Sequence, residues 1–372
     1  MSATSTSRRA LVLGRGKSGE AAAAELRRQG FTVEFAEDLG VVVASPGIRV
    51  KSELELGCEE LRRRGWRLLA VTGSKGKSSV VKAVADGINL AGGRAVACGN
   101  YGRPVCDLVG EPPGWAVVEV SSFMLETTVL APDTFEAAAV LNIQEDHLDR
   151  HGCVETYRNL KLRLMSYAKV GITGEDVSAE KVAADAPLLA GSYFDNGILR
   201  SNGVVAAELM RIAGLDDMAI ERAFGGFVPL PHRFSVVGVF GGVRCVDDSK
   251  ATSIAALSAG VEMAGSGVRL IAGGMPKGDD PKSAIPHLTK RVKKVYLIGR
   301  CAEVFSAAWS DAVDCEVCGT MERAVENAMR DAVNGETVLL SPGTASFDQF
   351  QSFGQRGDVF AELVKKEGQK KK

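Results

Sequence analysis

A phosphate-binding loop carries the clearest chemistry in this sequence. Residues 71–79 read Val-Thr-Gly-Ser-Lys-Gly-Lys-Ser-Ser, between an apolar strand predicted at 68–71 and a helix predicted from Lys77 onward. Glycines let backbone N–H groups turn toward a polyphosphate, and the start of the helix adds the positive end of its dipole. In such loops the lysine reaches the terminal phosphates and the next hydroxyl binds Mg²⁺. We therefore predict a nucleoside triphosphate site that comprises Thr72, Gly73, Ser74, Lys75, Gly76, Lys77, Ser78 and Ser79.

The loop departs from the usual pattern at its beginning. The first glycine, expected five residues before Gly76, is replaced by Val71. A Gly/Ser turn that precedes an ordinary helix is therefore the alternative interpretation. Gly-Lys-Ser directly after an apolar strand is nevertheless a specific signal, and it favours phosphate binding.

Two polar clusters follow apolar strands downstream of the loop. The strand predicted at 115–118 leads to Glu119 and Ser121, and the strand predicted at 137–141 leads to Asn142 and His147. Ligands bind beyond the carboxyl ends of strands in a parallel α/β sheet. A single acidic residue after a strand is usually only solvated. Two clusters behind one phosphate loop favour ligands of Mg²⁺ and phosphate on a shared edge.

The first block of the chain has the pattern of half a Rossmann fold. Gly14, Gly16 and Gly19 separate a strand at 10–13 from a helix at 20–28, and a strand at 31–35 then leads to acidic Glu37. This glycine spacing alone is a weak signal for nucleotide binding. A further apolar run at 41–44 ends in the turn Ser45-Pro46-Gly47.

The whole chain alternates between strand and helix patterns, which predicts an α/β fold with three parts. We place the parts at 1–66, 67–227 and 228–372. The last part has strands predicted at 244–246, 269–272, 294–298 and 337–340, and helices predicted at 302–309 and 321–333. Such alternation indicates a second doubly wound parallel sheet.

Composition excludes several classes of partner. The 372 residues are 45% hydrophobic and 24% charged, and their net charge of −1 indicates no general affinity for nucleic acid or anionic membranes. No apolar run approaches the roughly 18–20 residues that span a bilayer, and the Ser/Thr-rich start lacks the apolar core of a signal peptide. We therefore expect a cytoplasmic protein. The basic end at 365–372 is interpreted as a solvated tail.

The eight cysteines are scattered, and only Cys315 and Cys318 form a Cys-x-x-Cys pair. A structural zinc site usually needs a second such pair. We interpret all eight as reduced thiols.

Several motifs follow one another in a fixed order that resembles the Mur ligase family. After the phosphate loop they are Gly99–Gly102, Glu119–Glu126, Asn142–His151, Lys161–Arg163, Leu230–Phe234, Asp247–Thr252, Leu340–Phe350 and Gln355–Gly357. The resemblance covers the chain from about residue 68. It implies a Rossmann-like N-terminal domain at 1–66 that binds UDP and is shortened here, a central P-loop ATPase domain at 67–227, and a C-terminal Rossmann-like domain at 228–372 that binds an amino acid.

Within this family, the segment from Ser341-Pro342 to Gln355-Arg356-Gly357 resembles the branch that adds D-glutamate to UDP-N-acetylmuramoyl-L-alanine in peptidoglycan synthesis. The resemblance implies ATP, two Mg²⁺ ions, an acyl-phosphate intermediate, a carbamylated Lys161 and a monomer. Two alternatives stay open. One is another ligase of the family, such as a folylpolyglutamate-type enzyme, and the other is a trimmed ATP-binding homologue without ligase activity.

The resemblance also implies roles for individual residues. Lys77, Glu119, His147 and Lys161 would be catalytic, and Ser78 would join the last three as a metal ligand. Asn202, Arg233 and Asp248 would contact the nucleotide. The substrate-binding set would be Gly14, Gly16, Glu37, Ser45, Gly47, Asn100, Ser121, Lys250, Thr252, Lys277, Ser346, Phe347 and Phe353.

Taken singly, several of these residues have plainer interpretations. Lys161 would be a surface lysine on a helix predicted at 156–165. His147 and His151 have the spacing of a zinc pair on a helix, although the acidic residues around them favour Mg²⁺. Lys277 would be a loop lysine, and Phe353 a core aromatic.

The sequence also departs from the family pattern. Ser74-Lys75 stands where Thr-Asn is common, Met124 replaces a glutamine, and Phe347 replaces a leucine beside the acceptor site. The first block is short, as is the stretch from Lys161 to Asn202. Uridine recognition would therefore depend on Gly14–Gly19, Glu37 and Ser45–Gly47 alone.

Overall fold

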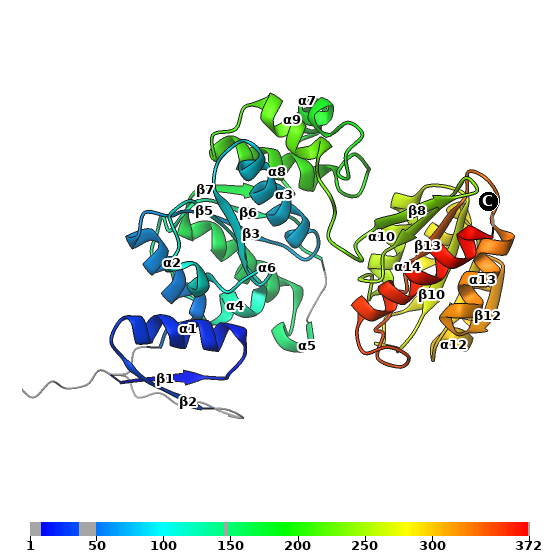
Figure 1. Ribbon diagram of the computed structural model, residues 1–372, viewed down its shortest axis with the longest axis horizontal. Coiled ribbons are helices and arrows are strands. Elements are labelled where there is room, and N and C mark those ends of the chain that lie inside the picture. Colours follow the sequence, from blue (N-terminus) through cyan, green and yellow to red (C-terminus); the bar gives the residue numbers. More distant parts are fainter. Residues whose placement is uncertain (1–8, 37–49, 145–147, 371–372) are drawn as a thin grey trace, which may run out of the picture. The chain divides into compact units, whose positions relative to one another are not determined.

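The structure is a computed structural model that describes residues 9–36, 50–144 and 148–370. It is a mixed α/β chain with parallel sheets, divided into two compact units at Met1–Phe227 and Val228–Lys372 (Figure 1). The first unit holds a small and a large sheet, and the second unit holds one sheet.

The small sheet has the predicted strand–loop–helix–strand arrangement. Strands β1 (Arg9–Leu13) and β2 (Thr32–Ala36) pair in parallel, and α1 (Lys17–Arg28) lies along one face of the pair (Figure 1). The helix begins at Lys17, earlier than the predicted residue 20, because Gly16 serves as its N-cap in extended conformation.

Gly19 explains why the glycine spacing matters in this half-fold. A Cβ atom at this position would collide with the carbonyl oxygen of Gly14, whereas a Cβ at Gly16 would meet nothing within 4 Å. The first turn of α1 therefore packs directly on the backbone that leaves β1.

The large sheet of the first unit is entirely parallel, with the order β4-β5-β3-β6-β7. Its strands are β3 (Arg67–Thr72), β4 (Ala95–Gly99), β5 (Trp115–Glu119), β6 (Phe135–Val140) and β7 (Ala168–Thr173). The predicted strands at 68–71, 115–118 and 137–141 are the three central ones. Central strands of a parallel sheet are buried on both faces and are therefore continuous apolar runs.

Helices cover both faces of this sheet. They are α2 (Glu53–Arg63), α3 (Lys77–Leu90), η1 (Val105–Leu108), α4 (Ser122–Thr127), α5 (Leu148–His151), α6 (Val154–Leu162), η2 (Arg163–Tyr167), α7 (Ala179–Leu189), α8 (Arg200–Ile212) and α9 (Asp217–Gly225). One face packs against α2, η1 and η2 in a single apolar core, and α3 lies against the strands with α8 and α9 behind it.

The sheet of the second unit has the order β12-β11-β10-β13-β9-β8, in which only β8 is antiparallel to its neighbour. The strands are β8 (Ser235–Phe240), β9 (Val243–Asp247), β10 (Val268–Gly273), β11 (Val292–Ile298), β12 (Cys315–Gly319) and β13 (Thr337–Leu340). The strands predicted from the sequence in this part are β9, β10, β11 and β13, so the predicted parallel sheet is confirmed.

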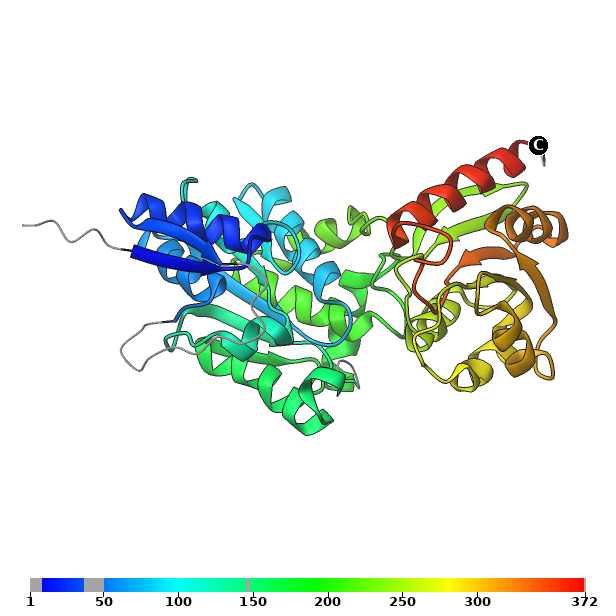
Figure 2. The same ribbon diagram turned by 90° about the horizontal axis from the view of Figure 1, so that it is seen from below.

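The helices of this unit are α10 (Ile254–Ala264), η3 (Pro281–Ala284), α11 (Ile285–Arg291), α12 (Ala302–Trp309), α13 (Met321–Asp331) and α14 (Phe353–Gln369). Helices α13 and α14 pack on one face of the sheet, and α10, α11 and α12 pack on the other (Figure 2). The two halves of the Cys-x-x-Cys pair take part in different cores, Cys315 beside α12 and Cys318 beside α13. All eight cysteines are free thiols, as predicted. Within the described ranges, no helix is both long and apolar enough to cross a membrane.

The collision at Gly19 generates a prediction with a matched control. Gly19→Ala should push the start of α1 away from β1 and cost roughly 1–3 kcal/mol locally. Hydrogen exchange should then be faster in β1 and α1 than in the wild type, while exchange in the large sheet stays unchanged. Gly16→Ala should leave the exchange pattern of β1 and α1 intact. Equal protection of these elements in both variants would contradict the packing argument.

Candidate functional site

Hydrogen bonds from Asn142, which follows a neighbouring strand, fix the backbone of the phosphate loop. It runs from the end of β3 to the start of α3, where Gly76 is the N-cap with a φ of 87°. The side chain of Asn142, which follows β6, accepts from the Lys75 amide at 2.8 Å and donates to the Lys75 carbonyl at 2.9 Å. The predicted clusters therefore do meet on one edge, and Asn142 clamps the backbone of the loop.

Two lysines converge on one carbonyl of this loop. Lys77 Nζ donates to the Gly73 carbonyl oxygen at 2.7 Å, and Lys161 Nζ donates to the same oxygen at 3.0 Å. Lys161 also donates to the Thr72 hydroxyl at 3.3 Å. Two ammonium groups this close repel one another, and an anion placed beside them would be strongly attracted.

Lys161 is a buried residue, so its interpretation as a surface lysine is wrong. Its exposed fraction is 1%, and its Nζ lies 4.6 Å from the centre of the Tyr157 ring. The Tyr157 hydroxyl lies 3.1 Å from Ser74 Oγ in the phosphate loop. The helix predicted at 156–165 is α6, which ends at Leu162 and continues as the 3₁₀ turn η2. This helix brings Lys161 under the loop.

Glu119 supplies a carboxylate oxygen that has no hydrogen-bond partner within the described part of the chain. It is the last residue of β5 and 2% exposed, and its Oε1 accepts from Asn100 Nδ2 at 2.7 Å. Its Oε2 is buried and has no hydrogen-bond partner among the described residues. An orphaned buried carboxylate oxygen is costly, and Mg²⁺ prefers such oxygen ligands. Glu119 therefore fits the ion that the motif order implies.

The remaining members of the implied metal set are only partly described. His147 lies outside the described residues, as do Glu37, Ser45 and Gly47 of the predicted uridine site. In the ranges that the structure describes, no group of three or more His, Cys, Asp or Glu side chains could hold a metal ion. Ser78 is buried at the start of α3, beside Lys77.

Asn202 lies beside the phosphate loop, as expected for a residue near the nucleotide. It belongs to α8 and is 6% exposed. A Cβ atom at Gly76 would meet the side-chain amide of Asn202, and the φ of 87° also favours glycine at this step of the loop. Ser121 is the N-cap of α4, and its hydroxyl accepts from the Met124 amide at 3.2 Å.

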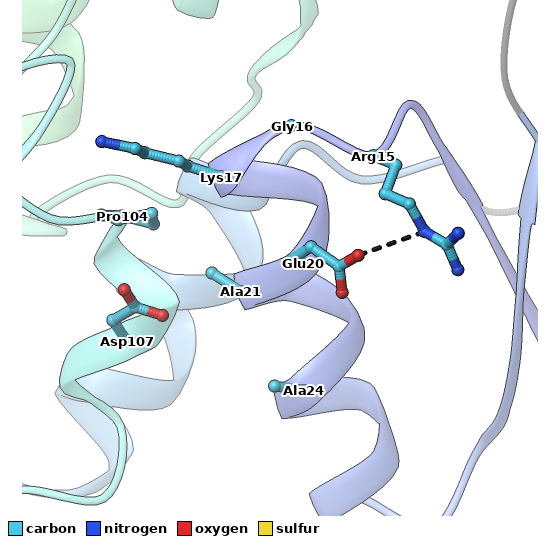
Figure 3. Close-up of a pocket in the computed structure, with 8 residues that line it drawn as sticks. All are labelled: Arg15, Gly16, Lys17, Glu20, Ala21, Ala24, Pro104 and Asp107. Atoms are coloured by element: carbon cyan, nitrogen blue, oxygen red, sulfur yellow. Dashed lines mark ion pairs between the residues drawn. The ribbon is translucent and has the colours of Figure 1, made fainter.

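A concavity of about 470 Å³ lies at the N-terminal end of α1 (Figure 3). Gly16 lines it together with Arg15 and Lys17, and Figure 3 shows these two basic side chains extending in opposite directions. Arg15 pairs with Glu20 at 3.1 Å. Other lining residues, Pro104 and Asp107, come from the segment around η1. The site therefore combines a helix N-terminus with Lys17, an arrangement suited to a phosphate group.

The predicted acceptor residues come from three adjacent strands of the second unit. Lys250 and Thr252 follow β9, Lys277 follows β10, and Ser346 follows β13, and these strands are parallel neighbours. The turns that carry these residues therefore lie at one carboxyl edge of the sheet. The Met275 amide donates to the Ala345 carbonyl at 2.9 Å and links two of the turns.

The individual acceptor residues differ in exposure. Lys250 Nζ lies 3.9 Å from the centre of the Phe353 ring, so these two predicted residues are brought together. Ser346 is 2% exposed, whereas Phe347 is 70% exposed, and Lys277 also lies on the surface. Phe353 is the first residue of α14 and is only partly buried, so it is no ordinary core aromatic.

Arg356 organises these turns, although the sequence analysis gave it no role. It is fully buried, and its guanidinium donates to Ser249 Oγ at 2.9 Å and to the carbonyls of Ser249, Thr344 and Ala345 at 2.8, 3.1 and 3.2 Å. Burial lowers the pKa of Arg356 to about 10, which still leaves it charged at neutral pH. The only sequence signal was its place in Gln355-Arg356-Gly357, 107 positions from Ser249.

Asp248 and Arg233 lie at the start of the same unit. Asp248 accepts from the Ser341 hydroxyl at 2.9 Å and from the Phe234 amide at 3.1 Å. Burial raises the pKa of Asp248 to about 7, and the charge of Arg233 opposes this shift. The carboxylate therefore faces Arg233 and the turn after β13.

Comparison with known proteins decides the family. Residues 71–187 match the Mur ligase middle domain, and residues 232–343 match the glutamate ligase domain of Mur ligases. The UDP-N-acetylmuramoylalanine--D-glutamate ligase of Nitratidesulfovibrio vulgaris is 34% identical over 95% of this chain and 95% of its own length. The chain belongs to the Mur ligase family. A ligase of the same name from Gloeobacter violaceus is 33% identical over 88% of this chain and 85% of its own.

Solved structures show the same Mur ligase fold. The MurF ligase of Thermotoga maritima, crystallised with ADP, aligns with a TM-score of 0.64 at 16% identity, over 99% of this chain and 97% of that one. The UDP-N-acetylmuramate-alanine ligase MurC of the same organism gives 0.61 at 14% identity, over 98% and 100%. The alignment with the Nitratidesulfovibrio ligase spans 419 positions, more than the 372 residues here, so that relative carries segments this chain lacks.

The Arg356 contacts generate a stability prediction. Arg356→Met removes the donors to the buried carbonyls of Ser249 and Thr344, and each unsatisfied carbonyl costs roughly 1–3 kcal/mol. We expect the second unit to be less stable than in the wild type. Hydrogen exchange in β9 and β13 should therefore be faster. Arg330→Met is the matched control, because Arg330 lies on the surface of α13 and its side chain is 62% exposed. Unchanged protection in Arg356→Met would contradict the clamp.

Proposed function

We propose that this chain is an ATP-dependent ligase that adds D-glutamate to UDP-N-acetylmuramoyl-L-alanine through an acyl phosphate, a step of peptidoglycan synthesis. The observation that carries the proposal is the convergence of Lys77 and Lys161 on the Gly73 carbonyl, in a chain whose relatives bear that enzyme's name. At the same sheet edge, Glu119 Oε2 has no hydrogen-bond partner among the residues that the structure describes, which supports a metal-assisted phosphoryl transfer.

We further propose a division of labour among three parts. Residues 1–66 would bind the uridine nucleotide, residues 67–227 would bind ATP, and residues 228–372 would bind D-glutamate. The small sheet with its concavity at α1 supports the first assignment, and Gly14 and Gly16 would turn the backbone toward the diphosphate. Asn100 and Ser121, at the ends of β4 and β5, would face the substrate carboxylate.

The first chemical step makes a carboxylate electrophilic. The terminal carboxylate oxygen of the L-alanine residue would attack the γ-phosphorus of ATP, and ADP would leave. Lys77 and the amides of the phosphate loop would hold the phosphate charge in place, and Asn202 would flank the nucleotide from α8. Mg²⁺ ions held by Ser78, Glu119, His147 and a carbamylated Lys161 would supply electrostatic stabilisation of the transferring phosphoryl group.

The second step joins the amino acid. The amine of D-glutamate would attack the acyl carbon, phosphate would leave, and the amine would lose a proton. Lys250, Thr252, Lys277 and Ser346 would hold the two acceptor carboxylates, with Phe347 and Phe353 beside them. Arg233 and Asp248 would contact the nucleotide from this part. Arg356 would act indirectly, because it fixes the turns that carry Ser346 and Lys250.

A coupled assay tests this proposal. Phosphate release is measured with ATP, Mg²⁺ and UDP-N-acetylmuramoyl-L-alanine, comparing D-glutamate, L-glutamate, D-glutamine and meso-diaminopimelate at equal concentration. D-glutamate should be preferred, because a site built for two carboxylates rejects ligands that leave its donors unpaired. Lys77→Ala, the inactive control, should lose on the order of 10²–10³ in rate.

Other results of this assay would favour a different function. Preference for diaminopimelate would place the chain in another branch of the family, and equal use of D-glutamine would contradict charge pairing. ATP binding without phosphate release from any acceptor would favour an ATP-binding homologue without ligase activity.

Lys161 generates a separate prediction. Burial strips hydration from an ammonium, and the neutral amine is the form that adds to carbon dioxide. Protein equilibrated with ¹³C-bicarbonate, Mg²⁺ and a non-hydrolysable ATP analogue should therefore show a carbamate carbon signal. Lys161→Arg should lack this signal and be inactive, since a guanidinium forms no such carbamate. An identical signal in Lys161→Arg would assign it to another amine.

A further inference from the structure

A buried histidine outside the phosphate loop bonds to the helix that follows Glu119. The side chain of His151, at the end of α5, is 2% exposed. Its Nε2 lies 3.0 Å from Ser122 Oγ, and its Nδ1 lies 3.2 Å from Glu126 Oε1. Both partners belong to α4, which begins just after Glu119 and Ser121. The imidazole therefore bonds to α4 at two points.

The surroundings of His151 favour one direction for its hydrogen bond with Ser122. Arg150 donates to Glu126 at 2.7 Å and holds the pKa of that carboxyl below its usual value. An ionised carboxylate can only accept, so Glu126 favours an N–H at Nδ1, and in that tautomer Nε2 accepts from the Ser122 hydroxyl. The chain from Glu126 to Ser122 thus has one consistent arrangement.

The other side of the imidazole faces α6. The rings of His151 and Tyr157 lie 5.3 Å apart between centroids, at an angle of 42°. Tyr157 in turn reaches Ser74 of the phosphate loop at 3.1 Å and has Lys161 Nζ over its ring. Helices α4 and α6 are also in direct contact. His151 therefore lies between the helix that follows Glu119 and the helix that carries Lys161.

A Ser-His-Glu order also occurs in hydrolases, where the serine is a nucleophile. Ser122 is 3% exposed, so no substrate can reach its hydroxyl. The arrangement thus holds helices together and performs no acyl transfer of its own.

We propose that His151 is a positioning residue that fixes the separation of Glu119 and Lys161 and thereby sets the metal affinity of the site. The inference rests on the proposed function only in taking these two residues as metal ligands. Groups that orient metal ligands typically contribute 10- to 100-fold to metal affinity. Nothing in the motif order assigns His151 such a role.

The test measures metal binding directly on the full chain. Wild type and His151→Phe are titrated with Mn²⁺ in the presence of a saturating non-hydrolysable ATP analogue, and bound metal is followed by electron paramagnetic resonance. Phenylalanine keeps the ring contact with Tyr157 and removes both the hydrogen bond to Ser122 and the contact with Glu126. The Mn²⁺ dissociation constant should rise about 10-fold, whereas nucleotide affinity measured without metal should stay unchanged.

His287→Phe is the matched control. His287 carries the same kind of pair, with Nδ1 3.6 Å from Glu262 Oε2, but its side chain is 36% exposed on the second unit. This variant should bind Mn²⁺ as the wild type does.

Ser122→Ala keeps the proposal testable if His151→Phe fails to fold, because it removes only one hydroxyl. It should weaken Mn²⁺ binding in the same direction, and the double variant should be no worse than His151→Phe alone, since both act through one network.

Two results would overturn the proposal: unchanged Mn²⁺ affinity in folded His151→Phe or Ser122→Ala, or no Mn²⁺ binding in the wild type. A wild type that binds Mn²⁺ and nucleotide but ligates no amino acid would refute the proposed function alone. Weaker Mn²⁺ binding in His151→Phe would then still support the positioning role.

Discussion

The repulsion between two ammonium groups at one carbonyl oxygen is the constraint on which the first unit depends. Lys77 and Lys161 both donate to Gly73, although they come from α3 and α6 on different sides of the loop. Such charges are held together only if the backbone around them cannot relax. Asn142 fixes the loop through the backbone amide and carbonyl of Lys75, and Asn202 packs against Gly76, whose positive φ favours glycine. Rigid surroundings thus maintain a concentrated positive charge, which phosphate can neutralise and which the proposed carbamate on Lys161 would relieve.

The second unit also contains a buried cation, Arg356, but its hydrogen-bond donors are directed at groups of the protein. The guanidinium of Arg356 is enclosed by three carbonyls and a hydroxyl, so its donors are consumed inside the protein. Its role is to tie the turn after β9 to the turn after β13. The proposed role of the lysines at the phosphate loop is to attract an anionic ligand. Arg356 instead donates hydrogen bonds to the backbone of the turns that carry proposed ligand-binding residues. A lysine could not replace it, because one ammonium cannot span four acceptors in a plane.

The sequence predicted the central strands of both large sheets and missed the edge strands, for one physical reason. Strands β3, β5, β6, β9, β10, β11 and β13 are buried runs of apolar residues, whereas β4, β7, β8 and β12 lie at sheet edges and contain more exposed positions. At the candidate site, the motif order implied roles for Lys77, Glu119 and Lys161 but none for Arg356 or His151, although both lie within motifs. The partners of those two residues lie 107 and 29 positions away, so their contacts exist only in the folded chain.

The contacts at positions 74 and 75 explain why the phosphate loop tolerates Ser74-Lys75. Where many family members have Thr-Asn, this chain has Ser74-Lys75. The clamp from Asn142 binds the backbone amide and carbonyl of Lys75, so any residue except proline can occupy this position without loss of the clamp. Position 74 is different, because the Ser74 hydroxyl bonds to Tyr157 and to the backbone of Gln144. Serine and threonine both offer that hydroxyl. The fold therefore restricts position 74 to hydroxyl residues and leaves position 75 open to a change of charge.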